Sequence, residues 1–490
     1  MGRHEGQKEL FSYQVDLDRR VRGDHPLRAI RAAVDFSFVR QEVAGCYGYN
    51  GNESVDPEVI LKLMFLLFFD DVKSERELMR MLPERLDYLW FLGFGLDDEI
   101  PDHSVLSKAR ARWGQAVFES LFVRTVQPCV AAGLVDGAKL HLDGSLINAN
   151  ASRDSVVRAG PELMAELKRA YHVEERKLEG PLGDPHYQPV NATLVSTTDP
   201  DAPCVRQNKH GASGDSRPRY KHHRAIDDRC GVITAVATTP GDVPEPTQSV
   251  NLVDQHERHT GCTAAAVVAD CQYGTAENYR QLQSRGLATH MAPCLPDRSE
   301  ANGIFPRERF TYDEARDLDV CPAGQTLHPR HFNERRQAYE YAIRKGVCAR
   351  CALRGQCTRG AHGRTLHRHF QHELVERAKT QGLSSIARRD RRRRRYLMEG
   401  SFAQAANRHH FKRARWRRLW RQQIQDWLIA ACQNAKTLVR AFRPGRRAGE
   451  NRVGAGVPRI AISIRRVLCL LAVKITQLLA PGTLPSYQLR

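Results

Sequence analysis

The segment Lys139-Leu140-His141-Leu142-Asp143 is where the sequence turns from a helical to an extended pattern. Polar and apolar residues alternate up to Leu142, as in a half-buried β-strand, and the strand is expected to end at Asp143. The short apolar run at residues 264–269 is a second predicted strand and is followed by Asp270. If the two strands are neighbours in one sheet, their carboxylates emerge at one end of the sheet and converge.

Converging carboxylates are the arrangement that metal-dependent phosphoryl transfer needs. Two divalent ions about 4 Å apart hold the attacking and leaving oxygens, and bridging carboxylates hold the ions. Mg²⁺ and Mn²⁺ prefer oxygen ligands, so two Asp and one Glu are enough to bind them. The alternative for each Asp taken alone is a turn former or a helix N-cap, which is the commoner role directly after a strand.

A third acid must come from elsewhere in the chain. Glu399 lies in the segment 376–443, which holds 19 Lys and Arg but only 4 Asp and Glu, and it is favoured over Glu373 and Glu376. A carboxylate that faces metal and DNA in an electropositive cleft fits this setting. The alternative is that Glu399 is salt-bridged to the neighbouring arginines.

The same basic segment is predicted to be helical and to bind DNA. It accounts for +15 of the net charge of +19, and a surface of that sign binds phosphate backbones through counterion release. Trp416 and Trp420, four positions apart, are interpreted as a core stripe, with stacking on an unpaired base as the alternative. The residues expected to contact DNA are Arg391, Arg392, Arg393, Arg394, Arg395, Arg413 and Arg417.

The overall composition narrows the class of protein further. The most apolar stretch, at residues 460–480, is interrupted by two Arg and one Lys, and the N-terminus has no apolar signal region. We therefore expect a cytosolic protein whose partner is nucleic acid and not a membrane. The 13 cysteines, an odd number in a long chain, argue against a disulfide framework.

Four of the cysteines are spaced like ligands of a structural zinc ion. Cys348-Ala349-Arg350-Cys351 is a Cys-x₂-Cys pair, followed by Cys357 and preceded by Cys321, and four thiolates suit tetrahedral Zn²⁺. A redox motif would need a strand-to-helix context that this segment lacks. Free thiols stay open as an alternative. A histidine could also replace Cys321, and the candidates are His328, His331 and His362.

The first 130 residues are predicted to be helical. Residues 57–69 are apolar at helical spacing, Ser74 with Glu77 three positions later is a helix-start signature, and a third helix begins near Asp102 or Ser104. Short helices with basic faces suit DNA binding, and a plain helical bundle with solvated charges fits the pattern equally well.

The central part of the chain is less regular. Residues 219–226 and 231–238 predict a hairpin, and residues 153–218 predict a long irregular excursion with one helix at 162–175. Residues 287–371 surround the clustered cysteines and show little periodicity.

A series of short motifs runs along the chain: Asp24-His25-Pro26-Leu27-Arg28, Ser54-Val55-Asp56-Pro57, Ser74-Glu75-Arg76-Glu77-Leu78, Pro101-Asp102-His103-Ser104, residues 143–152, Tyr220-Lys221-His222-His223 with Asp227, residues 269–274, Glu399 with Phe402, and Gln433-Asn434. In their order and combination these motifs resemble bacterial insertion-sequence transposases of the DDE type, in the broad IS-five-like group. The similarity runs from about residue 10 to about residue 442. At the second acid, family members often carry Asp-Ala-Gly-Tyr, whereas this chain has Asp-Cys-Gln-Tyr and loses a flexible glycine.

The resemblance implies an α/β fold, with an RNase H-like catalytic core that carries an inserted Cys-rich subdomain and follows an all-α N-terminal domain. It implies that Asp143 and Asp270 lie on adjacent strands and that Glu399 lies on a helix after the insertion. By similarity, the first Asp activates water through metal to nick the transposon end, and the freed 3′-hydroxyl attacks target DNA. Family members show a similar Cys pattern, which supports the zinc site.

The expected domains are residues 1–130, helical and DNA-binding; 135–285, the first part of the catalytic domain; 286–375, the insertion with the zinc site; 376–443, its basic helical remainder; and 444–490, an unassigned tail. The expected setting is the nucleoid in the bacterial cytoplasm. The expected partners are double-stranded DNA, as terminal inverted repeats and target, and a second copy in a homodimer. The alternatives are an inactive or domesticated zinc-containing DNA-binding protein and an RNase H-like nuclease without strand transfer.

Overall fold

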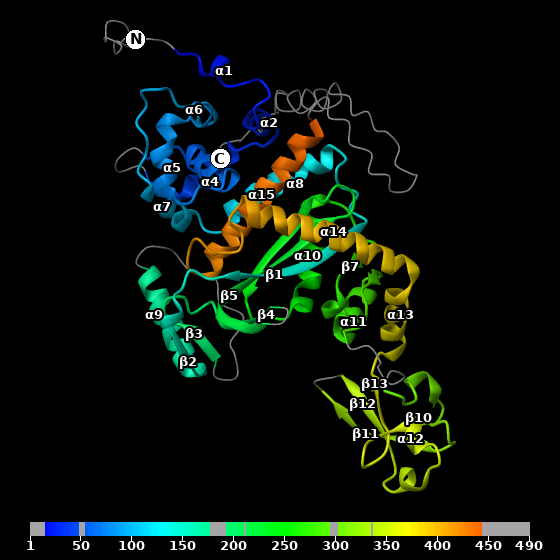
Figure 1. Ribbon diagram of the computed structural model, residues 1–490. Helices are drawn as coiled ribbons and strands as arrows, with labels where there is room; N and C mark the ends of the chain where they lie inside the picture. The colour runs from blue at the N-terminus through cyan, green and yellow to red at the C-terminus, as the bar shows by residue number, and fades with distance from the viewer. Residues whose placement is uncertain are drawn as a thin grey trace, which may run out of the picture.

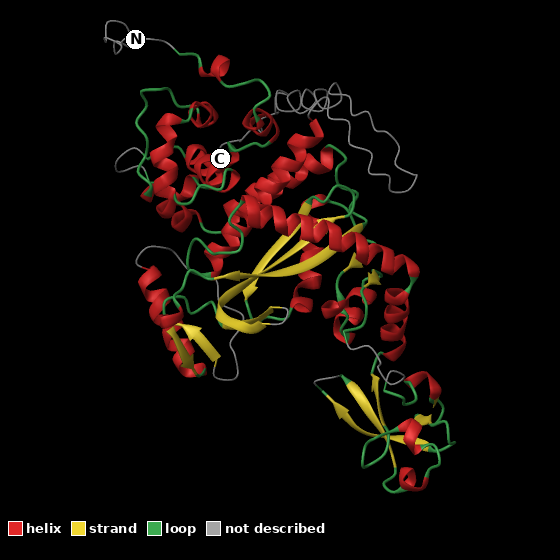
Figure 2. Ribbon diagram, in the orientation of Figure 1, coloured by secondary structure: helices red, strands yellow, loops and turns green. Residues whose placement is uncertain are grey.

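The computed structural model describes residues 15–48, 54–176, 193–209, 212–294, 302–334 and 337–442, and the predicted tail at 444–490 lies outside them. The described residues form a helical N-terminal region, a mixed sheet flanked by helices, and a small β-rich subdomain (Figure 1, Figure 2). The chain is therefore a mixed α/β protein that begins with helices, as the sequence predicts.

The N-terminal region is built on one apolar helix. The predicted helix at 57–69 is confirmed as α4 (Pro57–Phe69), and nearly all of its side chains are buried. The start signature at Ser74 is confirmed too, because the Ser74 hydroxyl accepts the Glu77 N–H at 3.1 Å. The other helices here are α1 (Leu17–Arg20), α2 (Pro26–Ala33), α3 (Phe38–Glu42), α5 (Glu75–Met81), α6 (Leu86–Leu92), α7 (Ser104–Trp113) and α8 (Ala116–Ala131).

The central sheet combines antiparallel and parallel pairing. Strand β1 pairs antiparallel with β5, which pairs antiparallel with β6, and on its other edge β1 pairs parallel with β7, which pairs parallel with β8. The two predicted acid-bearing strands, β1 and β7, are thus confirmed as neighbours. The strands are β1 (Lys139–Asn148), β4 (Cys204–Lys209), β5 (Ala212–Asp227), β6 (Ile233–Pro240), β7 (Ala266–Val268) and β8 (Ala288–His290).

The predicted end of the first strand at Asp143 is wrong. Strand β1 continues to Asn148 because β5 pairs with it from Leu140 to Asn148, whereas β7 pairs only with its first three residues. Asp143 therefore lies in mid-strand, where the parallel partner stops. Polar residues directly after Asp143 hide the alternation on which the prediction relied.

Helices cover the sheet and tie it to the N-terminal region. Helix α15 contacts α8, α4 and β6, whereas α14 contacts β1, β7 and β8. One hydrophobic cluster runs from Leu61 in α4 through Tyr220 in β5 to Ile429 in α15. The predicted boundary near residue 130 therefore crosses a shared core. The covering helices are α10 (Ser249–Thr260), α11 (Ala276–Ser284), α13 (His372–Leu383), α14 (Ser385–Arg408) and α15 (Leu419–Phe442).

Both irregular stretches of the sequence contain more regular structure than predicted. The first forms the predicted helix as α9 (Pro161–Arg176). It also forms β4 and a two-stranded antiparallel sheet of β2 (Val156–Ala159) and β3 (Thr193–Ser196). The second forms a five-stranded antiparallel sheet, and its strands are too short or too exposed to show a period of two. These strands are β9 (Thr311–Asp313), β10 (Leu318–Val320), β11 (Thr326–Asn333), β12 (Ala338–Ile343) and β13 (Thr365–His369), with the short helix α12 (Arg354–Cys357) beside them.

The β-rich subdomain leaves and re-enters the fold at one place. It follows β8 and ends at α13, and the side chain of Gln381 in α13 accepts the backbone N–H of Thr289 in β8 at 3.3 Å. Figure 1 shows it as a separate lobe below α11 and α13. Within the described residues, no helix has the length and apolar character that a membrane crossing requires.

Asp426 in α15 is expected to be a main polar anchor between that helix and the sheet. It is buried, accepts the Thr238 hydroxyl at 2.6 Å and the Gln422 amide at 2.8 Å, and lies 2.9 Å from Nδ1 of His222. Replacing Asp426 with Ala leaves these buried groups unpaired, so the free energy of unfolding should fall by about 3 kcal/mol or more. Asp426→Asn should cost less. Urea unfolding followed by circular dichroism measures both, and a loss below about 0.5 kcal/mol for Ala would contradict the assignment.

Candidate active site

Three carboxylates that lie on or shortly after strands β1, β6 and β7 come close together. Ligand oxygens of Asp143, Glu245 and Asp270 all lie within 4.8 Å of one another, and each residue is half-buried. Asp143 lies on β1, Asp270 follows β7, and Glu245 opens the 3₁₀ turn at Glu245–Gln248 that follows β6. The structure thus brings together two of the three predicted acids and adds one that the sequence interpretation missed.

Gly144 makes room for the third carboxylate. A Cβ atom at this position would lie 2.7 Å from Cδ of Glu245, closer than any real contact. Because glycine follows Asp143 directly, the Glu245 carboxyl group can rest against the backbone of β1 beside the Asp143 side chain. A side chain at residue 144 would force the Glu245 carboxyl group to shift from its present position.

Burial and mutual repulsion raise the pKa values of two of the three clustered carboxyl groups. Burial raises the pKa of Glu245 to about 7, with Asp143 and Asp270 adding to the rise and Lys221 opposing it. Burial also raises the pKa of Asp143, against the opposing effect of Arg394. Desolvated carboxylates that repel one another favour protonation or a bound cation. The buried hydroxyl of Tyr273 lies near these carboxylates, and among the described residues it has no hydrogen-bond partner. The oxygen donor set suits a hard divalent ion such as Mg²⁺.

Arg394 is the cation that contacts these carboxylates. Its guanidinium lies 2.8 Å from Asp143 and 3.7 Å from Asp270, and its Nε donates to the Leu142 carbonyl at 2.9 Å. Arg394 is nearly buried and projects from α14 toward the sheet. Part of the negative charge of the two aspartates is therefore balanced from within the chain.

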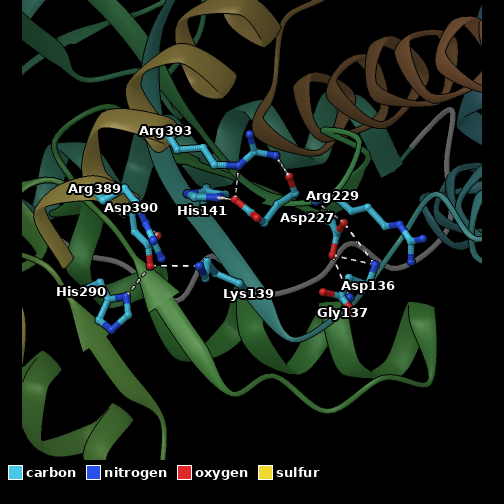
Figure 3. Close-up of polar contacts among 11 residues, drawn as sticks. Asp136, Gly137, Lys139, His141, Asp227, Arg229, His290, Arg389, Asp390 and Arg393 are labelled. Carbon is cyan, nitrogen blue, oxygen red and sulfur yellow. Dashed lines mark hydrogen bonds and ion pairs between the residues drawn. The ribbon is translucent and has the colours of Figure 1, made fainter. Parts of the chain in front are cut away.

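A polar network fixes the rotation of α14 against the sheet. Asp390 lies 2.8 Å from Nδ1 of His290 and 3.0 Å from Nζ of Lys139, and Arg393 pairs with Asp228 at 2.5 Å (Figure 3). These contacts reach the start of β1, the end of β5 and the end of β8. They keep one face of α14 on the sheet, and this face carries Arg394.

Glu399 does not join the acidic cluster in this structure. It lies on α14 five positions after Arg394, which at 3.6 residues per turn is about 140° around the helix. Its side chain is exposed, and no ion pair with an arginine is recorded for it among the described residues. The expectation that residues 143, 270 and 399 meet is therefore not met. The rivals Glu373 and Glu376 lie on α13, and Glu376 pairs with Lys379.

Glu245 had a sequence signal, although a weaker one than that of the two aspartates. It follows a predicted strand, as they do, but four residues lie between it and Pro240 at the end of β6. The intervening turn contains Gly241 and Pro244, and its reach could not be judged from spacing alone. The sequence signal for Glu245 was its position shortly after a predicted strand that could pair in the same sheet as the other two.

The motif around His222 in β5 contacts helices α14 and α15 near the acidic cluster but contributes no residue to the cluster. Arg224, the cross-strand partner of Asp143, is buried against the ring of Phe402 and donates to Ser401 at 2.7 Å. Burial lowers the pKa of Arg224 to about 9 and that of His222 to about 4. Gln433 accepts from Arg224 at 3.2 Å. The motif residues thus hold α14 and α15 on the sheet.

The predicted DNA-binding arginines differ in whether their side chains already bind other parts of the protein. Arg391, Arg393 and Arg394 are engaged by the protein itself. Arg417 donates to the Asn150 carbonyl at 3.1 Å but remains exposed. Arg392, Arg395 and Arg413 are exposed, and no partner of their side chains is recorded among the described residues. Trp416 and Trp420 pack against the hydrophobic core, which confirms the core interpretation.

All four predicted zinc ligands line one small pocket in the β-rich subdomain. Cys321, Cys348, Cys351 and Cys357 surround it together with apolar residues such as Leu327 and Ile343. The Cys321 sulfur accepts the Gln325 N–H at 3.3 Å. Burial raises the pKa of the Cys357 thiol, and the other three thiols add to the rise. Within the described residues, only the acidic cluster has three ligand atoms within 4.8 Å of one another. The four cysteine sulfurs therefore line one pocket, but no three of them lie within that distance of one another.

Two transposase families match the chain. The family "Transposase domain (DUF772)" matches residues 15–112, and the family "Transposase DDE domain" matches residues 320–439. No curated protein matches the chain. Among solved structures, the piggyBac transposase synaptic complex with hairpin DNA is similar at a TM-score of 0.32 and 11% identity, over 85% of this chain and 74% of that one. A TM-score that low does not establish a shared fold.

The chain therefore carries an N-terminal domain of the first transposase family and a DDE domain of the second. A DDE domain implies a phosphoryl-transfer enzyme that uses divalent metal ions. The matched range of that domain contains Glu399 and all four clustered cysteines, but it begins after Asp143 and Asp270. The assignment of those two acids to the site therefore rests on the geometry of the cluster.

The identity of the third acid can be tested by metal binding without DNA. Mn²⁺ affinity, measured by isothermal titration calorimetry, should fall about tenfold or more in Glu245→Gln, because a ligand of the cluster is lost. Glu399→Gln is the matched control and should bind like the wild type, because its side chain is exposed on the far face of α14. If Glu399→Gln lowered the Mn²⁺ affinity and Glu245→Gln did not, Glu399 would be the third metal ligand.

Proposed function

We propose that this transposase cleaves DNA at transposon ends and joins the freed ends to target DNA. The carrying observation is the meeting of Asp143, Glu245 and Asp270 at one end of a β-sheet. The strand order β6-β5-β1-β7-β8, with the first three antiparallel and the last two parallel to β1, supports an RNase H-like core. We infer that the cluster holds Mg²⁺ or Mn²⁺, as two ions.

Each acid of the cluster has its own role in this proposal. Asp143 and Asp270 hold the metal ions, and Glu245, whose carboxyl group lies against Gly144, completes the ligand set. The bound ions supply Lewis acidity and an activated water or 3′-hydroxyl. Arg394 balances the aspartates before loading and is placed to bind a phosphate oxygen afterwards.

The outer face of α14 provides the surface for the DNA backbone. Arg388, Arg392 and Arg395 recur at spacings of four and three, so they fall within about 60° of arc on one exposed stripe. Glu399 continues this stripe. Its carboxylate therefore lies where DNA is expected, and it could join the metal site only if α14 rotated against the contacts that Asp390 and Arg393 make.

Cleavage of the element's own end tests the function directly. Asp143→Ala should lower the Mg²⁺-dependent cleavage rate about a thousandfold, because about 4 kcal/mol of transition-state stabilisation is lost. Asp97→Ala removes an exposed carboxylate away from the cluster and should leave the rate unchanged. Equal cleavage by wild type and Asp143→Ala would remove the catalytic assignment.

The same assay separates the remaining alternatives. A nuclease without strand transfer would release nicked ends but give no joined product with target DNA. An inactive or domesticated DNA-binding protein would give neither product. We also propose that two copies pair the two transposon ends, because each end needs its own set of acids.

We propose that the four cysteines of the β-rich subdomain bind a structural zinc ion. The support is their convergence on one pocket, with an N–H group donated to Cys321. Zinc–sulfur bonds of about 2.3 Å would draw the sulfurs closer together and replace the repulsion between the thiols. A small sheet with few buried residues would gain a cross-link from this ion.

Metal content checks the zinc proposal. Purified protein should contain about one zinc per chain by elemental analysis, and the double substitution Cys348→Ser/Cys351→Ser should abolish it. The double substitution Cys46→Ser/Cys230→Ser removes two exposed cysteines outside the pocket and should retain the zinc. Zinc-free wild-type protein, prepared without chelators, would contradict the proposal.

A further inference from the structure

A second pocket lies where the N-terminal helices meet the segment that joins α14 to α15. It has a volume of about 540 Å³ and is lined from α4, the start of α5, the start of α7, the end of β1 and residues 410–416. None of the three clustered carboxylates lines it. Its walls carry the basic residues Lys73, Arg76, His103, His410, Arg413 and Arg415.

The charge of this pocket is almost wholly positive. Glu75 is the one acidic residue of its lining, and its carboxylate is paired with Arg110 at 2.5 Å. Arg415 is held by the backbone carbonyls of Val72 and Lys73, which anchors the C-terminal segment to the N-terminal region. Just outside the lining, Asp71 lies 3.5 Å from His410 and 3.3 Å from Arg415, and Asp102 lies 3.0 Å from His103. Within the described residues no ion pair is found for Lys73, Arg76 or Arg413, so these three residues leave the pocket an excess of positive charge that favours an anionic ligand.

Two cations of the lining are available to such a ligand. Lys73 and Arg413 are exposed, and across the ranges that the structure describes neither side chain has a recorded hydrogen bond or ion pair. Lys73 comes from the N-terminal region and Arg413 comes from the segment before α15. A phosphate group between them would be gripped from both parts of the protein.

The aromatic residue of the pocket is not available for a base. Arg110 lies over the ring of Trp416 at 3.8 Å, and Phe68 meets the same ring edge-on at 5.7 Å. Because one face of the indole is covered and it packs against the core, stacking on an unpaired base is disfavoured. The chemistry of the pocket therefore selects the sugar–phosphate backbone and not a base.

The pocket is rigidly connected to the strand that carries Asp143. The Ala414 N–H donates to the Asn148 carbonyl at 2.8 Å, and the Asn148 N–H donates to the Lys412 carbonyl at 3.0 Å. Asn148 is five residues along β1 from Asp143, which corresponds to about 17 Å. At 3.4 Å per base pair, that distance spans about five base pairs of duplex. Lys412, which donates to Ser145 at 2.6 Å, lies between the two places.

From these observations we infer that the pocket of Lys73 and Arg413 is a DNA-backbone subsite that binds a phosphate about five base pairs from the scissile bond. The inference rests on the proposed function for the position of the scissile bond. The subsite joins the N-terminal region and the catalytic sheet on one DNA duplex. It reads no base, so its contribution is the same for every sequence.

Salt-dependent DNA binding tests the subsite without catalysis. Affinity for a random-sequence duplex is measured by fluorescence anisotropy over a range of salt concentrations, in buffer without divalent cations. Lys73→Gln/Arg413→Gln should make the slope of log affinity against log salt shallower by about 2, because two phosphate contacts are lost. Arg344→Gln/Lys345→Gln removes the same charge from exposed positions of the β-rich subdomain, outside the pocket, and should leave the slope close to that of the wild type.

Neutral phosphates then locate the contact on the end that the enzyme cleaves. A methylphosphonate scanned along that end should weaken wild-type binding about five base pairs from the scissile bond and should have no effect there on the Lys73→Gln/Arg413→Gln variant. Equal slopes for the two double variants, or a methylphosphonate effect that persists in the Lys73→Gln/Arg413→Gln variant, would overturn the subsite. Lys73→Gln alone, with a slope change of about 1, guards against misfolding of the double variant. Loss of cleavage with intact slope differences would count against the proposed function only.

Discussion

Strand β1 is hydrogen-bonded along both edges, and the position of the acidic cluster depends on that double pairing. Antiparallel pairing with β5 holds β1 straight through Asp143, whereas parallel pairing with β7 ends two residues before it. Asp143 therefore projects where β7 has just ended and Asp270 begins the next turn. Neither edge alone would bring the two carboxylates together, because β5 supplies the length of the strand and β7 supplies the second acid.

The two faces of helix α14 make different contacts. Its inner side brings Arg394 to the aspartates and anchors the helix through Asp390. Its outer side presents a row of arginines to solvent. Because a rigid helix couples the two sides, a movement of the outer arginines also shifts the guanidinium beside Asp143. In the function proposed above, contact with the DNA backbone and charge balance at the acidic cluster would thus be linked through one element.

The architecture and the two aspartates could be predicted because their signals are local. Helix α4 shows its apolar spacing, the hairpin of β5 and β6 shows its alternation, and each Asp is preceded by an apolar run. The third acid could not be predicted in the same way. The exclusion of Glu399 depends on the rotation of α14, which long-range pairs such as Asp390 with His290 determine. Glu245 depends on the path of a turn and on the absence of a side chain at residue 144. The β-rich subdomain escaped prediction because β11 exposes most of its residues.

The β-rich subdomain departs after β8 and comes back at α13, and the two stems touch, with Gly382 packed against the carbonyl of Met291. An excursion whose ends are already joined can grow or shrink with little penalty, since closing a longer loop costs entropy only logarithmically. Evolution can therefore exchange this lobe for one of another size or another surface while the register of α14 over β1 stays the same. The catalytic sheet and the lobe are in this sense free to diverge at different rates.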